Sequence, residues 1–119
     1  MKITEEQKAL LSLIANSLFG VKAEIPCNTD FNRLLTESKQ QAVTALALKN
    51  VSMPENVKDT NTVFKNITVN SRVFADHTLL NNIMTKANIP YTVLKGAASA
   101  YYYPDPIFRA MGDVDFLVK

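Results

Sequence analysis

The 119-residue sequence is poor in the residues that build disulfide-rich or zinc-binding domains. It has one cysteine, Cys27, one histidine, His77, and no tryptophan. A single cysteine cannot form a disulfide within the chain, and it excludes a cysteine-rich zinc site. No neighbour in the sequence would position His77 as a general base, so we interpret it as a structural residue.

The chain also lacks a large charge of one sign and a long apolar run. Its formal net charge is +2, and its lysines and arginines do not cluster, so there is no strong nucleic-acid signature. No apolar stretch resembles a signal peptide or approaches the roughly 20 residues of a membrane span. We therefore expect a cytoplasmic globular protein without a membrane partner.

Glycine and proline are scarce, and neither occurs between residues 55 and 89. This interval predicts one long helix from about Thr60 to Ala87. Its apolar residues form two stripes on nearly opposite sides, so we expect different packing partners at its two ends or a kink near residues 70–71. The first stripe contains Val63, Phe64, Ile67 and Phe74, and the second contains Val73, Leu80, Ile83, Met84 and Ala87.

Two further helical regions are predicted before this helix. Thr4 and Gln7 form a capping-box pattern at the start of the first, and Gly20 is placed to end it. Asp30 is a typical N-cap for the second, whose apolar pattern breaks near Ser38. The sequence therefore predicts a helical region over residues 1–88.

The character of the chain changes after Pro90. A short apolar run over residues 91–94 predicts a strand, and Lys95 and Gly96 follow it before a short helical stretch. A strand that turns into a helix leaves free backbone N–H groups at the turn, where an anion such as phosphate can bind. Glycine at this place lets a ligand approach the backbone closely.

A second strand is predicted over residues 113–118. Side chains alternate along a strand, so Asp113 and Asp115 would share one face, with their Cα atoms about 6.6 Å apart. Two carboxylates at this spacing suit Mg²⁺, which prefers oxygen ligands and completes its shell with waters or phosphate oxygens. The alternative is an edge strand with one solvated face, for which two alternating aspartates are ordinary.

Three strings together resemble a known signature: LKGAA (94–98), YYPDP (102–106) and RAMGDVDFLV (109–118). They are similar to an uncharacterised family of the DNA polymerase β-type nucleotidyltransferase superfamily. The resemblance implies that Gly96 forms the phosphate turn and that Asp113 and Asp115 bind the metal. It also implies that Arg109 clamps phosphate, and that Lys95 and Ser99 are further phosphate contacts.

The resemblance also implies a reaction and a fold. The reaction is transfer of a nucleotidyl group from a nucleoside triphosphate such as ATP to an acceptor, with Mg²⁺ or Mn²⁺. The fold is a helix-rich α/β (α+β) chain, in which residues 89–119 begin a mixed-sheet nucleotidyltransferase core after the helical region 1–88.

The superfamily takes a third carboxylate from a later strand, and none follows in this chain. We therefore expect an N-terminal fragment, inactive by itself, whose last strand leaves an edge open to self-association. Two alternatives remain: an inactive relative of the enzymes, or a non-catalytic helical module that binds a protein partner.

Overall fold

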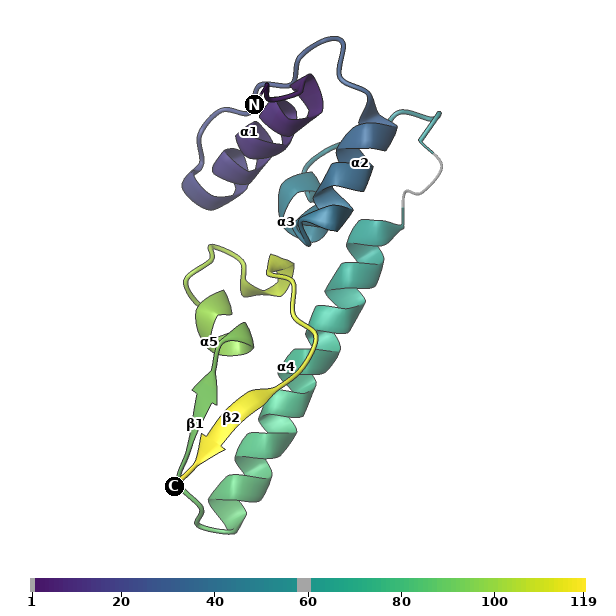
Figure 1. Cartoon of the computed structure of the whole chain (residues 1–119). Coiled ribbons are helices and arrows are strands. Elements are labelled where there is room, and N and C mark those ends of the chain that lie inside the picture. Colours follow the sequence, from purple (N-terminus) through teal and green to yellow (C-terminus); the bar gives the residue numbers. More distant parts are fainter. Residues whose placement is uncertain (1, 58–60) are drawn as a thin grey trace. The chain divides into compact units, whose positions relative to one another are not determined.

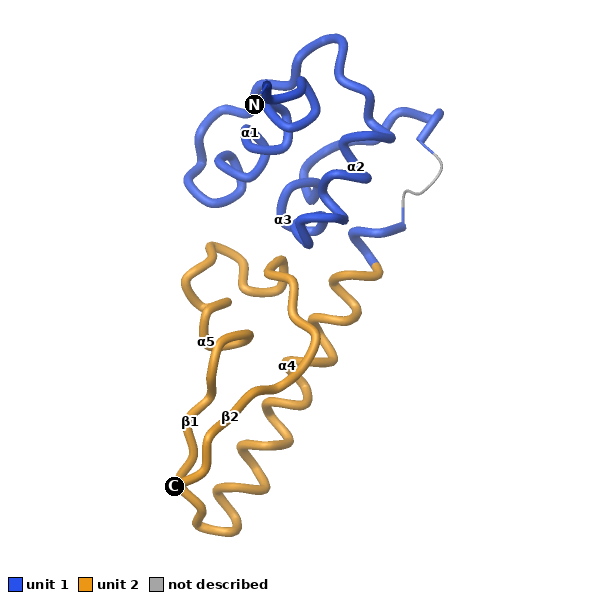
Figure 2. The backbone as a smooth tube through the Cα atoms, in the orientation of Figure 1, with its two compact units in different colours: residues 1–64 blue, residues 65–119 orange. Residues whose placement is uncertain are grey.

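The computed structural model describes residues 2–57 and 61–119. The chain is helix-rich and carries a two-stranded antiparallel sheet, which confirms the predicted α+β class (Figure 1). It divides into two compact units, residues 1–64 and residues 65–119 (Figure 2). The predicted division at residue 88 concerns where a catalytic core begins, and it stays a prediction.

The first helix of unit 1, α1 (Glu5–Phe19), has the ends that the sequence predicts. Thr4 Oγ1 accepts the backbone N–H of Gln7 over 3.2 Å, and the Gln7 side chain accepts the N–H of Thr4 over 3.1 Å, so the capping box is confirmed. Gly20 has a φ of 68°, the left-handed conformation that ends many helices. Local signals therefore fix both ends of α1.

The second helical region is split into α2 (Phe31–Gln40) and α3 (Thr44–Leu48). The Asp30 carboxylate caps α2 by accepting the N–H groups of Asn32 and Arg33, as predicted. The break predicted near Ser38 lies at residues 41–43, where Ala42 adopts a left-handed conformation with a φ of 54°. Ser38 stays within α2, where it is buried.

Helices α1, α2 and α3 enclose the hydrophobic core of unit 1. Leu34 is fully buried at its centre, and Val63 from the start of α4 packs against the same cluster. The buried members are Ala9, Leu10, Leu13, Leu34, Leu35, Ala47, Leu48 and Val57.

Unit 2 is built on the long helix α4 (Thr62–Lys86), which continues without a break through residues 70–71. The predicted start near Thr60 lies outside the described residues. Asn88, with a φ of 54°, turns the chain after α4. The chain then forms β1 (Tyr91–Leu94), α5 (Gly96–Ala100), the 3-10 turn η1 (Pro106–Phe108) and β2 (Asp115–Val118). None of the helices in the described part of the chain is long and apolar enough to cross a membrane.

The two predicted stripes of α4 flank one inward face. Asn70 and Val73 are its buried residues, and His77 is half-buried two turns beyond Asn70. Because Asn70 and His77 lie in the middle of this face, its apolar residues are separated into two stripes in the sequence. The expectation of different partners is confirmed, since Val63 packs in unit 1 and Val73 lies in the core of unit 2.

Candidate functional site

The connection between β1 and α5 has an unusual backbone. Lys95 has φ 48° and ψ −138°, and Gly96 has a φ of 27°. Both lie in the region that favours glycine, yet Lys95 carries a side chain. Such strained positions cost about 1–3 kcal/mol each and cluster at functional sites. The Lys95–Gly96 turn is therefore the first part of a candidate site.

The strain makes a prediction about stability. Lys95→Gly should be more stable than Lys95→Ala by about 1 kcal/mol, because glycine adopts this backbone without the side-chain penalty. Alanine serves as the control, since both variants remove the lysine side chain. Urea denaturation of the two proteins measures the difference. Equal stabilities would show that Lys95 is not strained in solution.

Asp115 is placed beside this turn by the sheet register. It is the first residue of β2 and pairs with Leu94, the last residue of β1. Its Oδ2 lies 3.9 Å from Lys95 Nζ. Both side chains are partly exposed, so solvent screens this ion pair and it adds little stability.

Asp113 approaches the same turn through its backbone. A Cβ added to Gly96 would lie 3.7 Å from the carbonyl oxygen of Asp113. The prediction that β2 begins at Asp113 is wrong, because β1 ends at Leu94 and offers no partner beyond Asp115. Asp113 lies in the segment without regular structure before the strand, and it is exposed.

The other two predicted phosphate contacts, Arg109 and Ser99, lie outside the Lys95–Gly96 turn. Arg109 directly follows η1, and its Nη1 donates to the carbonyl of the adjacent Ala110 over 3.2 Å. Ser99 is in α5, where its backbone N–H donates to the carbonyl of Lys95 over 3.0 Å. The structure thus brings Lys95, Gly96 and the two acids together. The guanidinium of Arg109 instead bonds to the backbone of its own loop.

The donor chemistry at this place fits a hard divalent cation. Asp113 and Asp115 offer carboxylate oxygens with access to solvent, and Mg²⁺ is commonly held by one or two carboxylates together with substrate phosphates. Within residues 2–57 and 61–119, no three His, Cys, Asp or Glu side chains are grouped so that they could hold a metal ion. The two acids are therefore a partial ligand set.

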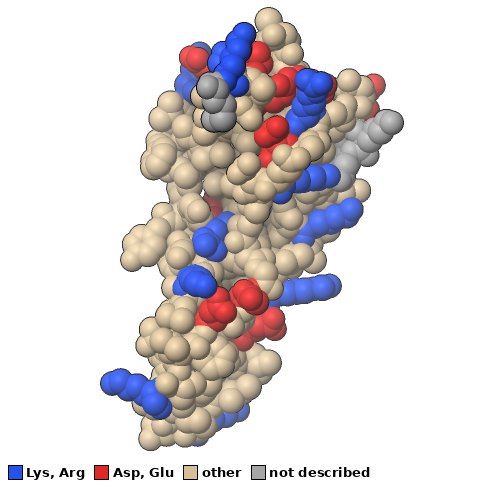
Figure 3. Space-filling view, viewed as in Figure 1, with Lys and Arg blue, Asp and Glu red and all other residues tan. Residues whose placement is uncertain are grey.

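Charged side chains of both signs lie on the surface around this site. On the face shown in Figure 3, basic and acidic side chains are interspersed, and acidic side chains gather over the start of β2 with basic ones beside them. Opposite charges this close suit a metal bound together with an anionic ligand better than a long polyanion.

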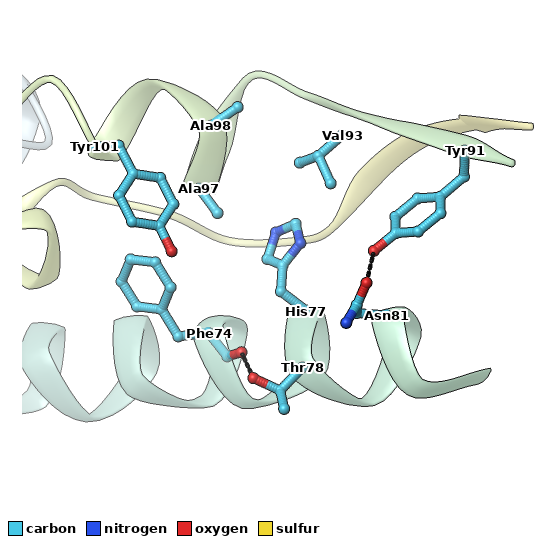
Figure 4. A pocket seen from close by; sticks show the side chains of 9 residues that line it. All are labelled: Phe74, His77, Thr78, Asn81, Tyr91, Val93, Ala97, Ala98 and Tyr101. Atoms are coloured by element: carbon cyan, nitrogen blue, oxygen red, sulfur yellow. Dashed lines mark hydrogen bonds between the residues drawn. The ribbon is translucent and has the colours of Figure 1, made fainter. Parts of the chain in front are cut away.

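His77 lies on the other face of the sheet from Asp115. It lines an open cavity of about 650 Å³ between α4 and β1, together with Val93, Ala97 and Tyr101 (Figure 4). Val93 and Leu94 point to opposite faces, and Leu94 is the partner of Asp115. Nε2 of His77 is buried with no hydrogen-bond partner among the described residues. This position separates His77 from the two acids, and its structural role stays a prediction.

One residue near the site was missed by the sequence interpretation. Asn70 of α4 is buried and bonds to the backbone of the loop that leads into Asp113. The available signal was a polar residue between the two apolar stripes of a long helix. The role of this polar residue is evident only from its hydrogen-bond partners, which lie far away in the sequence.

Comparison with known protein families places most of the chain in one of them. The model of a family described as uncharacterised nucleotidyltransferase matches residues 27–119, which include all of α2 to β2. No curated protein and no solved structure matches the chain.

Proposed function

Because the chain belongs to the uncharacterised nucleotidyltransferase family, we propose that it carries part of a Mg²⁺-dependent site that uses a nucleoside triphosphate. In the proposed reaction, an acceptor oxygen forms a bond to the α-phosphorus of the triphosphate. The bond from that phosphorus to the bridging oxygen breaks, pyrophosphate leaves, and the acceptor proton passes to solvent. The observation that carries the proposal is the closeness of the Lys95–Gly96 turn to both Asp113 and Asp115.

The acids and the turn have separate roles in this proposal. Asp113 and Asp115 would hold Mg²⁺ or Mn²⁺, which when bound lowers the charge on the triphosphate and activates the acceptor oxygen. Gly96 presents backbone without a side chain, so phosphate oxygens can approach it. Lys95 and Arg109 would donate to phosphate oxygens, and Ser99 would add a hydroxyl donor.

The two acids leave positions in the proposed metal site for further ligands. Among the described residues no third His, Cys, Asp or Glu is grouped with them, and water or phosphate oxygens can complete the shell of Mg²⁺. Activity is to be measured on the whole product of the natural gene.

The deciding experiment is pyrophosphate release from each of the four ribonucleoside triphosphates. We expect release with Mg²⁺, loss of release after chelation with EDTA, and recovery when Mg²⁺ is returned. Nucleotide binding measured by calorimetry with and without Mg²⁺ is the second readout. If neither release nor metal-dependent binding occurs with any nucleotide, the proposal is refuted.

A second candidate is a non-catalytic helical interaction module. It is favoured by two apolar side chains of α4, Leu79 and Ile83, which are 58% and 53% exposed and lie one turn apart. Exposed apolar residues at this spacing suit contact with a partner helix. Absence of Mg²⁺-dependent nucleotide binding would make this the leading function.

A further inference from the structure

Asn70 connects the middle of α4 to the loop that carries Asp113. Its side chain is 1% exposed. Nδ2 donates to the carbonyl oxygen of Ile107 over 2.7 Å, and Oδ1 accepts the backbone N–H of Met111 over 3.1 Å. One side chain therefore holds the chain at two points, at Ile107 within η1 and at Met111.

Asparagine suits this task because its planar amide offers a donor and an acceptor together. A backbone group away from solvent that loses its partner destabilises the fold, so these two bonds favour one loop conformation. The Met111 side chain is buried in the same cluster as Val73 and Ala97. Hydrogen bonds and packing thus fix the backbone at Met111.

The fixed point is close to the acids. Met111 precedes Asp113 by two residues, so the two Cα atoms cannot be more than about 7 Å apart. On its other side, the Asp113 carbonyl packs near Gly96. Asp113 is therefore held between Asn70 and the Lys95–Gly96 turn, and the chain enters β2 at Asp115 from this position.

We propose that Asn70 is a positioning residue for the carboxylates of Asp113 and Asp115. By fixing the loop at Ile107 and Met111, it directs the chain so that both acids lie beside the Lys95–Gly96 turn. This inference rests on the proposed function, because the quantity that Asn70 controls is metal binding by the two acids.

The test is Asn70→Ala in the full-length protein, with Mn²⁺ affinity measured by electron paramagnetic resonance. We expect the Mn²⁺ Kd to rise roughly tenfold, the size of effect seen when support around metal ligands is lost. The transfer rate should fall at low Mg²⁺ and recover as Mg²⁺ is raised, because a weakened site is filled by more metal. Because bound metal also stabilises a weakened fold by mass action, circular dichroism must show that the variant is folded before metal is added.

Asn82→Ala is the matched control, since Asn82 is an exposed asparagine of the same helix. Asn70→Ser is the second variant in case Asn70→Ala does not fold. Its uncharged hydroxyl can still donate or accept a hydrogen bond, so it should lose less Mn²⁺ affinity than alanine.

The outcomes separate the two proposals. Folded Asn70 variants with wild-type Mn²⁺ affinity would overturn the inference and leave the proposed function standing. A rate loss that high Mg²⁺ does not correct would also overturn it, in favour of a purely structural Asn70. A wild-type protein that binds neither Mn²⁺ nor nucleotide would overturn both.

Discussion

Asp115→Asn is expected to lower the rate of nucleotidyl transfer roughly a thousandfold, because bound metal supplies several kcal/mol of charge stabilisation and each 1.36 kcal/mol is a factor of ten. Asparagine keeps the size of the side chain but loses the negative charge that holds the cation. Asp113→Asn should act in the same direction. Pyrophosphate release by the full-length protein measures both variants.

Fold stability should be almost unchanged in Asp115→Asn, which separates a catalytic loss from unfolding. The substitution removes the ion pair in which Asp115 Oδ2 lies 3.9 Å from Lys95 Nζ, and exposed pairs of this kind contribute about 0–1 kcal/mol. Asp76→Asn, at an exposed acid of α4, is the control and should keep the wild-type rate. If Asp115→Asn and Asp76→Asn are equally active, Asp115 does not bind the metal.

Leu34→Ala is expected to lower the free energy of unfolding of unit 1 by about 2–5 kcal/mol, the cost of removing a buried leucine and leaving a cavity. Leu34 is 0% exposed and lies in the cluster formed by α1, α2 and α3. Urea denaturation followed by circular dichroism measures the loss, since the chain has no tryptophan for fluorescence.

The matched control for Leu34→Ala is Leu11→Ala, because Leu11 of α1 is 60% exposed. Its loss should be within about 0.5 kcal/mol, as for surface substitutions in general. A similar loss in both variants would mean that Leu34 is not at the centre of a packed core.

The ends of the helices were predictable because their signals are local. Thr4 and Gln7 satisfy each other across one turn, and Asp30 caps the N–H groups directly after it. Gly20 ends α1 by a backbone conformation that glycine adopts without strain. Each of these interactions joins residues within four positions, so no distant partner is needed to find it.

The elements of the candidate site were partly predictable. The order strand, turn, helix and strand over residues 91–118 follows from the sequence, and the family match agrees with the resemblance of its motifs. The start of β2 was not predictable, because it depends on where β1 runs out of pairing partners. The roles assigned to Gly96, Asp113 and Asp115 stay predictions.

By itself, the sequence determined the helix caps, the α+β class and the family. Only the tertiary structure decided that Asp115 stands opposite Leu94, that Lys95 is strained, and that Asn70 holds the loop before Asp113. The physical reason is the length of chain between partners. Asn70 bonds to residues 37 and 41 positions away, and a side chain acquires such partners only when the whole unit folds.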